Sequence, residues 1–167
     1  MPSRTIRIAD YDPEWPEIFL QEAERVRGVL GARVLRLEHV GSTSVPGLAA
    51  KPIVDMVLEI VDSADEPGYV PVLAEAGYEL HVREPEWHEH RMFKGRAGGV
   101  YLHVFSTGCP EIARMLRFRD WLRGNAEDRA LYERTKRELA DRDWSRMQEY
   151  ADAKTGVVEE IMKKAGA

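Results

Sequence analysis

A chain of 167 residues that is 44% hydrophobic and 32% charged has enough apolar material for a sizeable core, which excludes a disordered protein. Its net charge of −5 argues against bulk binding to nucleic acid, because a protein that coats nucleic acid needs a basic surface to displace counterions. No apolar run has the length of a membrane span, no signal peptide opens the chain, and the single cysteine, Cys109, offers neither a disulfide nor a cysteine zinc cluster. We therefore expect one cytoplasmic domain, residues 1–167, with no membrane partner.

The first elements of the chain are a short strand and a helix. Residues 5–9 alternate between apolar and charged or polar side chains, which is typical of an edge strand. Asp12 and Pro13 then begin a helix, because Asp12 can cap it and proline is tolerated in a first helical turn. Gly31 ends this helix. Its core-facing residues recur at helical spacing and are Trp15, Phe19, Ala23, Val26 and Leu30.

A turn of small residues follows, between an apolar strand at 34–40 and a second one at 52–60. Gly41 and Gly47 have no Cβ, so backbone N–H groups can approach an anion closely here. Hydroxyl donors and a point charge suited to phosphate are added by Ser42, Thr43, Ser44 and Lys51.

Asp55 stands on the second of these strands, where a metal ligand would be wanted beside bound phosphate. The plainer alternative is that Gly-Ser-Thr-Ser is an ordinary turn and that Asp55 caps a neighbouring loop. Each residue alone fits this alternative. Their combination within one strand–turn–strand unit favours a site that holds a metal–phosphate group.

The rest of the first two-thirds of the chain shows weaker signals. Residues 62–68 form a polar loop, and a helix at 69–76 ends at Gly77. Alternation then predicts a strand at 78–82 and a turn at 83–86. Two further strands, joined as a hairpin by a glycine-rich connection at 95–99, are expected at 87–94 and 99–105.

From Pro110 onward the pattern is helical. Gly124 and Asn125 break the first helix, and Asn125 can cap the next one. Ser145 and Gln148 match a capping box and open a last helix through Ile161. The sequence therefore predicts an α+β domain: a mixed β-sheet with flanking helices, and a helical C-terminal third packed against it.

The run from Glu38 to Asp55, EHVGSTSVPGLAAKPIVD, resembles the signature of the GrpB (UPF0157) family, which belongs to the nucleotidyltransferase-fold superfamily. Further resemblance lies at 12–15, 101–104, 116–123 and 150–154. It implies a nucleotidyltransferase-like fold that binds a nucleoside triphosphate with a divalent metal, Mg²⁺ or Mn²⁺. In such a site Gly41, Ser42 and Thr43 would hold phosphates, Asp55 and Ser42 would be catalytic, and Lys51 would offset charge.

One position departs from the superfamily pattern. Two residues after Asp55, where a second metal-binding acid is expected, stands Val57. Glu59 shares the strand face with Asp55 but lies about 13 Å away at the usual rise per residue, too far to share an ion. A two-metal clamp is therefore in doubt, and a Val57→Asp variant is expected to gain metal affinity.

Histidines extend the candidate metal site. His39 directly precedes the turn and is either a metal ligand or phosphate donor, or a histidine bonded to a backbone carbonyl. His103 lies in an apolar strand where the resemblance places the superfamily's third acid, and a buried imidazole needs a polar partner. The predicted ligands are thus Asp55, His39 and His103, and nitrogen would favour Mn²⁺ or Zn²⁺ over Mg²⁺. His88 and His90 have strand spacing, as a metal pair or in a solvated loop.

Basic residues of the C-terminal third are further candidates. Arg117 and Arg123 would contact a triphosphate, because a guanidinium donates two parallel hydrogen bonds to phosphate. Lys136 and Lys154 are candidates of the same kind. The alternative for all four is a charged, solvated helix face.

Three functions stay open at this point. The first is nucleotidyl transfer to an acceptor that the sequence does not name. The second, suggested by Val57, is a catalytically reduced module that binds a nucleotide or another phosphate-bearing small molecule. The third is an accessory domain associated with dephospho-CoA kinase and coenzyme A metabolism, which the resemblance implies; no protein partner is named by the residues.

Overall fold

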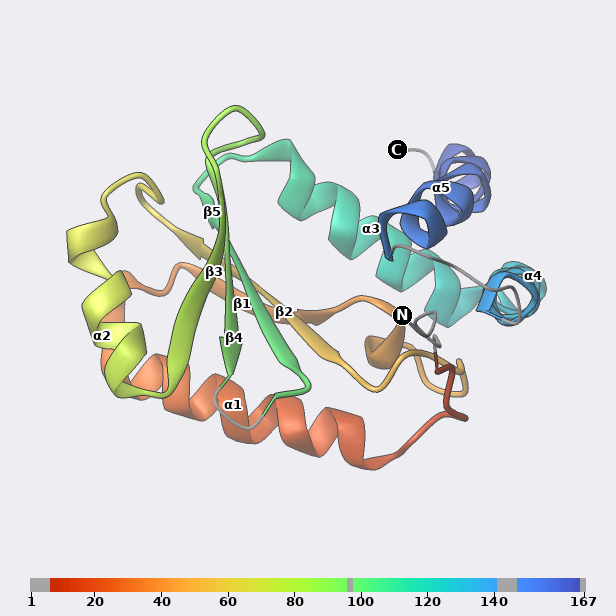
Figure 1. Cartoon of the computed structure of the whole chain (residues 1–167), viewed down its shortest axis with the longest axis horizontal. Helices are drawn as coiled ribbons and strands as arrows, with labels where there is room; N and C mark the ends of the chain where they lie inside the picture. Colours follow the sequence, from red (N-terminus) through yellow and green to blue (C-terminus); the bar gives the residue numbers. More distant parts are fainter. Residues whose placement is uncertain (1–6, 96–97, 141–146, 166–167) are drawn as a thin grey trace, which may run out of the picture.

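A five-stranded mixed sheet organises the fold in a computed structural model that describes residues 7–95, 98–140 and 147–165, with the backbone alone for 147–154. The strands are β1 (Arg36–Val40), β2 (Val54–Ile60), β3 (Tyr78–Glu84), β4 (His90–Gly95) and β5 (Val100–Ser106). Their order across the sheet is β1-β2-β5-β4-β3 (Figure 1). β2 and β5 pair in parallel, and the other neighbours are antiparallel.

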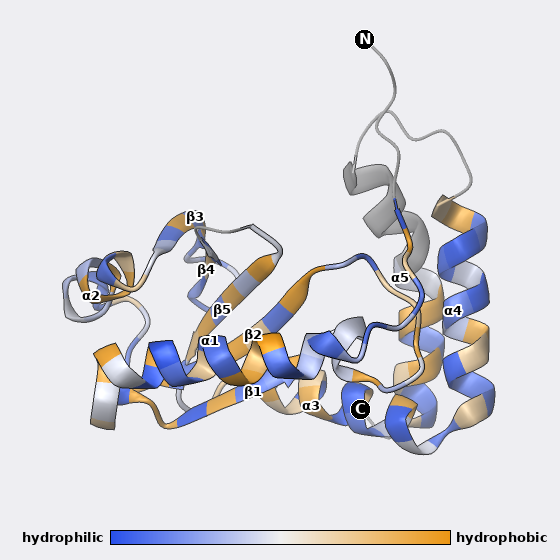
Figure 2. Ribbon diagram, turned by 90° about the horizontal axis from the view of Figure 1, so that it is seen from below, coloured by the Kyte–Doolittle hydropathy of each residue, from blue (hydrophilic) through white to orange (hydrophobic). Residues whose placement is uncertain are grey.

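Helices cover the sheet on both sides. They are α1 (Glu14–Leu30), α2 (Val70–Glu75), α3 (Pro110–Gly124), α4 (Ala126–Ala140) and α5 (Met147–Lys164), with short 3₁₀ turns η1 (Gly31–Arg33), η2 (Ser42–Ser44) and η3 (Glu66–Gly68). In Figure 1, α1 lies on one side of the sheet and α3 on the other, while α4 and α5 stand beside the end where β2 begins. Hydrophilic and hydrophobic residues alternate along α1 in Figure 2, as a helix with one buried face requires.

Alternating strand residues build the larger core on the α1 side of the sheet. On β2 these residues are Val54, Met56, Leu58 and Ile60, and they join the α1 residues Trp15, Ala23, Val26 and Leu30. Burial of the residues predicted for this helix follows the expected spacing, with Phe19 partly buried against the same core. The carboxylate of Asp12 accepts the backbone N–H of Glu14, so it helps to begin α1 as predicted.

The opposite side of the sheet is covered only in part. Val40, Val57 and Phe105 pack under Ile112 of α3 as a small buried cluster. Asp55 is the next residue of β2 on this side, and its side chain is 29% exposed. This side of the sheet is therefore sealed around Val57 and open at Asp55.

A third cluster joins the helical C-terminal third to the segment after η2. Val45 and Leu48 of that segment pack with Leu122, Tyr132 and Ile161 from the three C-terminal helices. Asn125 accepts the backbone N–H of Asp128 and caps α4 as expected. The turn after β1 thus lies between the sheet and the helical third.

The predicted α+β arrangement, a mixed sheet followed by a helical third, is confirmed. Three local predictions need correction or lie outside the structure. β3 continues to Glu84, so the turn comes later than predicted. His88 and Glu89 have positive φ and belong to this turn, and β4 begins only at His90. His88 and His90 therefore share no strand face. Residues 7–9 are the described part of the strand expected at 5–9, and among these three Ala9 alone pairs, in an isolated bridge with Ala50. Residues 1–6 and Ser145 lie outside the described residues.

Among the helices that the structure describes, none is both long and apolar enough to cross a membrane.

Candidate functional site

The turn after β1 lies directly against Asp55, as its spacing predicts. Gly41 has a φ of 74°, and a Cβ at this position would lie 2.8 Å from Oδ2 of Asp55. Glycine is therefore needed twice, for the left-handed backbone and for the close approach of the carboxylate. The backbone N–H of Ser44 closes the turn by donating to the Gly41 carbonyl at 3.1 Å.

A cavity of about 160 Å³ opens beside this turn. It lies on the side of the sheet that α3 leaves open at Asp55. Its polar lining combines one carboxylate with two ammonium groups, from Lys51 and Lys136, and a hydroxyl from Ser42. The full lining is Ser42, Thr43, Ala50, Lys51, Ile53, Asp55, Tyr101 and Lys136.

Lys136 reaches this cavity from α4 and is only 2% exposed. Its Nζ donates to Oγ of Ser42 at 2.9 Å and to the carbonyl of Ala49 at 2.8 Å, and lies 4.7 Å from the ring centre of Tyr132. One turn earlier on α4, Glu133 accepts the backbone N–H of Ala49 at 2.8 Å. The helical third therefore delivers a buried cation to the turn predicted for phosphate.

His39 is not brought together with Asp55. In the β1–β2 register His39 pairs with Met56, and Val40 pairs with Asp55, so the two side chains point to opposite sides of the sheet. His39 stacks on Phe19 of α1 at a ring distance of 5.1 Å. The predicted three-residue metal set of Asp55, His39 and His103 is therefore not assembled in the described structure.

The His39 ring is neutral and its tautomer is set by Thr43. The Thr43 hydroxyl donates to the carbonyl of Ile53 at 3.1 Å, so it can only accept from Nε2 of His39 at 2.9 Å, which carries the proton. Burial, followed by the charge of Arg123, lowers the pKa of His39 to about 4. Both His39 and Thr43 thus hold the turn in shape, and the Thr43 hydroxyl hydrogen is already used.

His103 does lie beside Asp55, on the open side of the sheet. Nε2 of His103 is 3.1 Å from Oδ1 of Asp55, and its Nδ1 is 3.1 Å from Nε2 of His90. Nδ1 of His90 is in turn 2.7 Å from Oε1 of Glu84. Burial lowers the pKa of His90, against the opposing effect of its hydrogen bond to Glu84. Asp55 thus has one oxygen towards Gly41 and the other towards a chain of two imidazoles.

Of the two arginines predicted to contact phosphate, Arg123 instead holds the turn from outside, together with Arg119. Arg123 donates from Nε to the carbonyl of Ser44 at 2.9 Å, and Arg119 donates from Nη1 to the carbonyl of His39 at 3.1 Å. Neither arginine lines the cavity, and neither does Arg117, which is exposed on α3. Burial and the neighbouring charge of Arg119 lower the pKa of Arg123.

Val57 is fully buried under α3, so the position of the missing second acid belongs to the core. Within the described residues, no group of three or more histidine, cysteine, aspartate or glutamate side chains is arranged to hold a metal. Asp55 and His103 are the pair that could hold one, with the remaining ligands coming from water or a bound phosphate.

The sequence pattern gives little weight to three residues of this region. Lys136 is only a secondary candidate there, although Glu133 three residues earlier shares its helix face and the two together could indicate a buried polar contact. Tyr101 was not singled out, and the pairing of His90 with His103 depends on a β4–β5 register that the sequence does not reveal.

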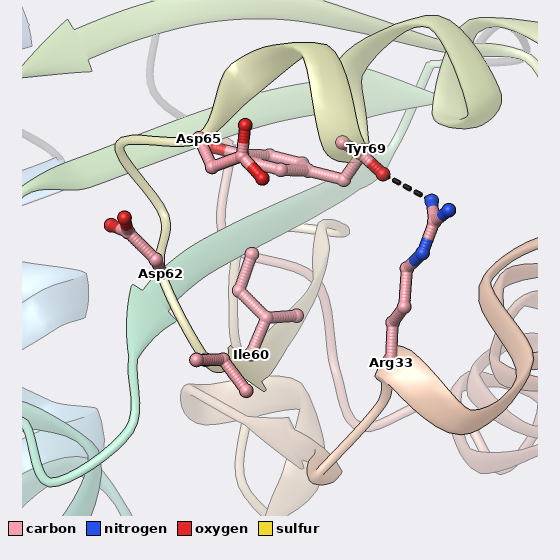
Figure 3. A pocket seen from close by; sticks show the side chains of 7 residues that line it. Arg33, Ile60, Asp62, Asp65 and Tyr69 are labelled. Carbon is pink, nitrogen blue, oxygen red and sulfur yellow. Dashed lines mark hydrogen bonds between the residues drawn. The ribbon is translucent and has the colours of Figure 1, made fainter.

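A second cavity, of about 260 Å³, lies at the far end of β2 (Figure 3). Two of its polar side chains are held by the surrounding backbone: Arg33 donates to the carbonyl of Gly68, and Asp62 accepts the backbone N–H of Ala64. The predicted site residues lie elsewhere, and the cavity beside Asp55 is the candidate site.

Comparisons with known proteins point to one family. The family model described as "GrpB protein" matches residues 5–164. A UPF0157 protein of Halalkalibacterium halodurans is 58% identical, over 98% of this chain and 84% of that protein. A UPF0157 protein of Streptomyces coelicolor is 47% identical, over 97% and 85%. The crystal structure of the conserved protein GrpB from Enterococcus faecalis covers 96% of this chain and 100% of its own, with a TM-score of 0.79 and 31% identity.

Two likenesses are to parts of longer chains. The dephospho-CoA kinase of Mycolicibacterium paratuberculosis is 30% identical over 82% of this chain, which covers 40% of that enzyme. A chain of the Cid1 poly(U) polymerase with bound MgGTP matches 70% of this chain and 42% of its own, with a TM-score of 0.44 and 14% identity. Each match covers less than half of the longer chain, so the activity of that protein is not carried over to this chain.

Proposed function

The chain belongs to the GrpB family, and from the cavity between the Gly41 turn and Asp55 we propose that it binds a nucleoside triphosphate or another phosphate-bearing small molecule together with a divalent cation. The observation that carries this proposal is the direct approach of Gly41 to the Asp55 carboxylate beside two lysines.

The cavity suits phosphate groups in size and charge. Its volume of about 160 Å³ is smaller than the roughly 300 Å³ of the smallest usual ligand pockets, so it takes the phosphates, while a base or other group lies outside. Lys51 and Lys136 supply positive charge, and Ser42 supplies a hydroxyl already held by Lys136. Tyr101 at the rim is the aromatic surface nearest to the emerging part of the ligand.

Asp55 and His103 are the residues that would hold the cation. Their facing atoms, Oδ1 and Nε2, are 3.1 Å apart, and neighbouring ligands of an octahedral ion with bonds of about 2.1 Å are separated by about 3.0 Å. A bound cation neutralises phosphate charge. The oxygen and nitrogen pair favours Mn²⁺, with Mg²⁺ and Zn²⁺ as alternatives.

The proposed reaction is nucleotidyl transfer. The oxygen of an acceptor hydroxyl forms a bond to the α-phosphorus and releases its proton to solvent, the bond from this phosphorus to the bridging oxygen of the β-phosphate breaks, and pyrophosphate leaves. Lys51 and Lys136 stabilise the negative charge that builds up on the leaving phosphates, because phosphoryl chemistry depends mainly on positioning and electrostatics. Gly41 and Ser42 orient the phosphates at the turn.

Nucleotide binding is tested by thermal shift and calorimetry with each nucleoside triphosphate, with and without Mn²⁺ or Mg²⁺. Lys51→Met is expected to weaken binding about 10- to 100-fold, the effect of one charged hydrogen bond. Lys163→Met, an exposed change on α5, is the matched control and should leave the affinity unchanged. Absence of binding by the unmodified protein, or equal affinity of Lys51→Met, would overturn the proposal.

A second candidate function is binding without turnover, and the burial of Val57 favours it, because the position of a second acid is closed. It predicts nucleotide affinity with no release of pyrophosphate from a labelled nucleoside triphosphate. Dephospho-CoA and coenzyme A belong in the same ligand panel, since both bear phosphate and since the dephospho-CoA kinase likeness covers most of this chain. Selective binding of either one would favour the accessory role.

A further inference from the structure

Four polar side chains from four neighbouring strands form a continuous line on the open side of the sheet. Glu84 of β3, His90 of β4, His103 of β5 and Asp55 of β2 are joined by separations of 2.7, 3.1 and 3.1 Å. We infer that His90 and Glu84 are positioning residues, which fix the His103 ring so that its unprotonated Nε2 forms a divalent-cation site with Asp55. The inference rests on the cation site of the proposed function.

Hydrogen-bond directions follow from one end of this line. A glutamate carboxylate only accepts, so Nδ1 of His90 carries the proton that points to Glu84. With that proton on Nδ1, Nε2 of His90 can accept the hydrogen bond that the Nδ1–H group of His103 donates. Nε2 of His103, 3.1 Å from Asp55, is then the ring nitrogen through which a cation would be bound.

The surroundings of His90 hold its ring in place. His90 is 6% exposed, and the centre of its ring lies 5.1 Å from that of Trp87, 4.9 Å from that of Phe105 and 5.3 Å from that of His103. All four members of the line sit on strands, which hold ligand geometry more rigidly than loops do.

The line therefore ends in two groups that can ligate one cation together. Nε2 of His103 and Oδ1 of Asp55 face each other at 3.1 Å. A metal-bound histidine with its second N–H held by an outer partner is a recurring arrangement. Here that outer partner is His90, itself held by Glu84.

Two measurements without nucleotide test this assignment. Titrations of Mn²⁺ and Zn²⁺ are compared for the unmodified protein, His90→Phe, Glu84→Gln and Glu79→Gln. His90→Phe keeps the ring against Trp87 and Phe105 but removes the acceptor, and it should weaken metal binding about 10- to 100-fold. Glu84→Gln keeps an acceptor oxygen and should weaken binding less. Glu79→Gln, an exposed change on the same strand outside the line, should have no effect.

Nitrogen NMR of the unmodified protein, labelled at histidine, shows directly which ring nitrogen carries the proton. It needs no variant, so misfolding of a variant cannot affect the result. With Zn²⁺ bound to the unmodified protein, we expect a proton on Nδ1 of His103 and a metal-shifted Nε2. A proton on Nε2 of His103, equal metal affinity for His90→Phe, or no metal binding at all would overturn the inference. Loss of nucleotide binding with these metal results intact would instead defeat the proposed function alone.

Discussion

The two sides of the sheet near the Gly41 turn hold the same kinds of polar group but use them differently. On the α1 side, His39 is 6% exposed, stacks on Phe19 and donates to Thr43. On the α3 side, Asp55 is 29% exposed and His103 20% exposed, and both border open space. The sealed side holds the turn in shape, and the open side leaves Asp55 and His103 accessible, as the proposed ligand requires. For these two histidines, burial and the side of the sheet, more than residue type, distinguish the structural group from the candidate ligand.

Val57→Asp is the substitution with the largest expected effect, because it places a charge within the sealed part of the α3 side. Val57 is completely buried among Val40, Phe105 and Ile112. An unpaired carboxylate there should lower the free energy of unfolding by about 4 kcal/mol or more, so the gain of metal affinity that the sequence suggests is no longer expected. Urea denaturation measures the effect.

Val57→Ala is the matched control for this substitution. It removes apolar contacts without adding charge and should cost about 2 kcal/mol. A stable Val57→Asp variant that binds an additional metal ion would show that the boundary between sealed and open regions lies elsewhere.

The second prediction concerns the pH dependence that the sealed His39 creates. Its native pKa of about 4 lies below the unfolded value of 6.5, so the unfolded chain takes up the proton first as pH falls. Stability should therefore be complete above pH 6.5, decline between 6.5 and 4 by at most about 3 kcal/mol, and level off below.

His39→Gln keeps a donor for Thr43 but does not titrate, so it should lack this decline. Denaturant unfolding at several pH values between 7 and 4.5 compares the two proteins. This pH window avoids most of the loss of stability that comes from Glu66. The hydrogen bond from Arg83 is the main reason why the pKa of Glu66 is lowered to about 2, so its protonation destabilises the fold only as the pH falls below 4.5. Equal slopes for both proteins would mean that His39 is not sealed.

The residue types and their spacing in the sequence were enough to predict the central unit of the candidate site. The glycine, the hydroxyl residues and the spacing to Asp55 predicted the adjacency that Gly41 and Asp55 show. The GrpB resemblance is confirmed by the family model over residues 5–164. Asp12 before α1, Pro110 in the first turn of α3 and Asn125 before α4, together with apolar spacing, located these three helices.

Predictions that depended on which side of the sheet a residue faces were harder. Glu38 and His39 are neighbours near the end of β1, and only the register with β2 decides that His39 turns to α1 and away from Asp55. Likewise the arginines of α3 have the charge of phosphate ligands, but packing places Arg119 and Arg123 on backbone carbonyls of the turn. Such choices arise from tertiary contacts between distant segments, which composition and periodicity do not contain.

Gly41→Ala tests how the two sides meet at the turn. The added Cβ would lie 2.8 Å from Oδ2 of Asp55, and alanine would have to adopt the positive φ of this position. We therefore expect the free energy of unfolding to fall by about 2 kcal/mol, together with loss of ligand binding. Gly47→Ala is the control, because Gly47 has a φ of 81° but nothing within 4 Å of its Cβ position. It should show the backbone cost alone and retain binding; equal effects of both variants would deny any special contact with Asp55.

The smallest expected change in stability comes from the open side itself. Asp55→Asn keeps the shape of the side chain, and loss of the carboxylate charge from a group that is 29% exposed should cost about 0–1 kcal/mol. We therefore expect a melting temperature within a few degrees of the unmodified protein, while metal and nucleotide affinity drop sharply because the carboxylate charge is gone. Thermal unfolding and metal titration on the same samples separate the two effects. A large loss of stability with unchanged ligand affinity would place Asp55 among the structural groups, alongside His39, and remove the distinction between the two sides.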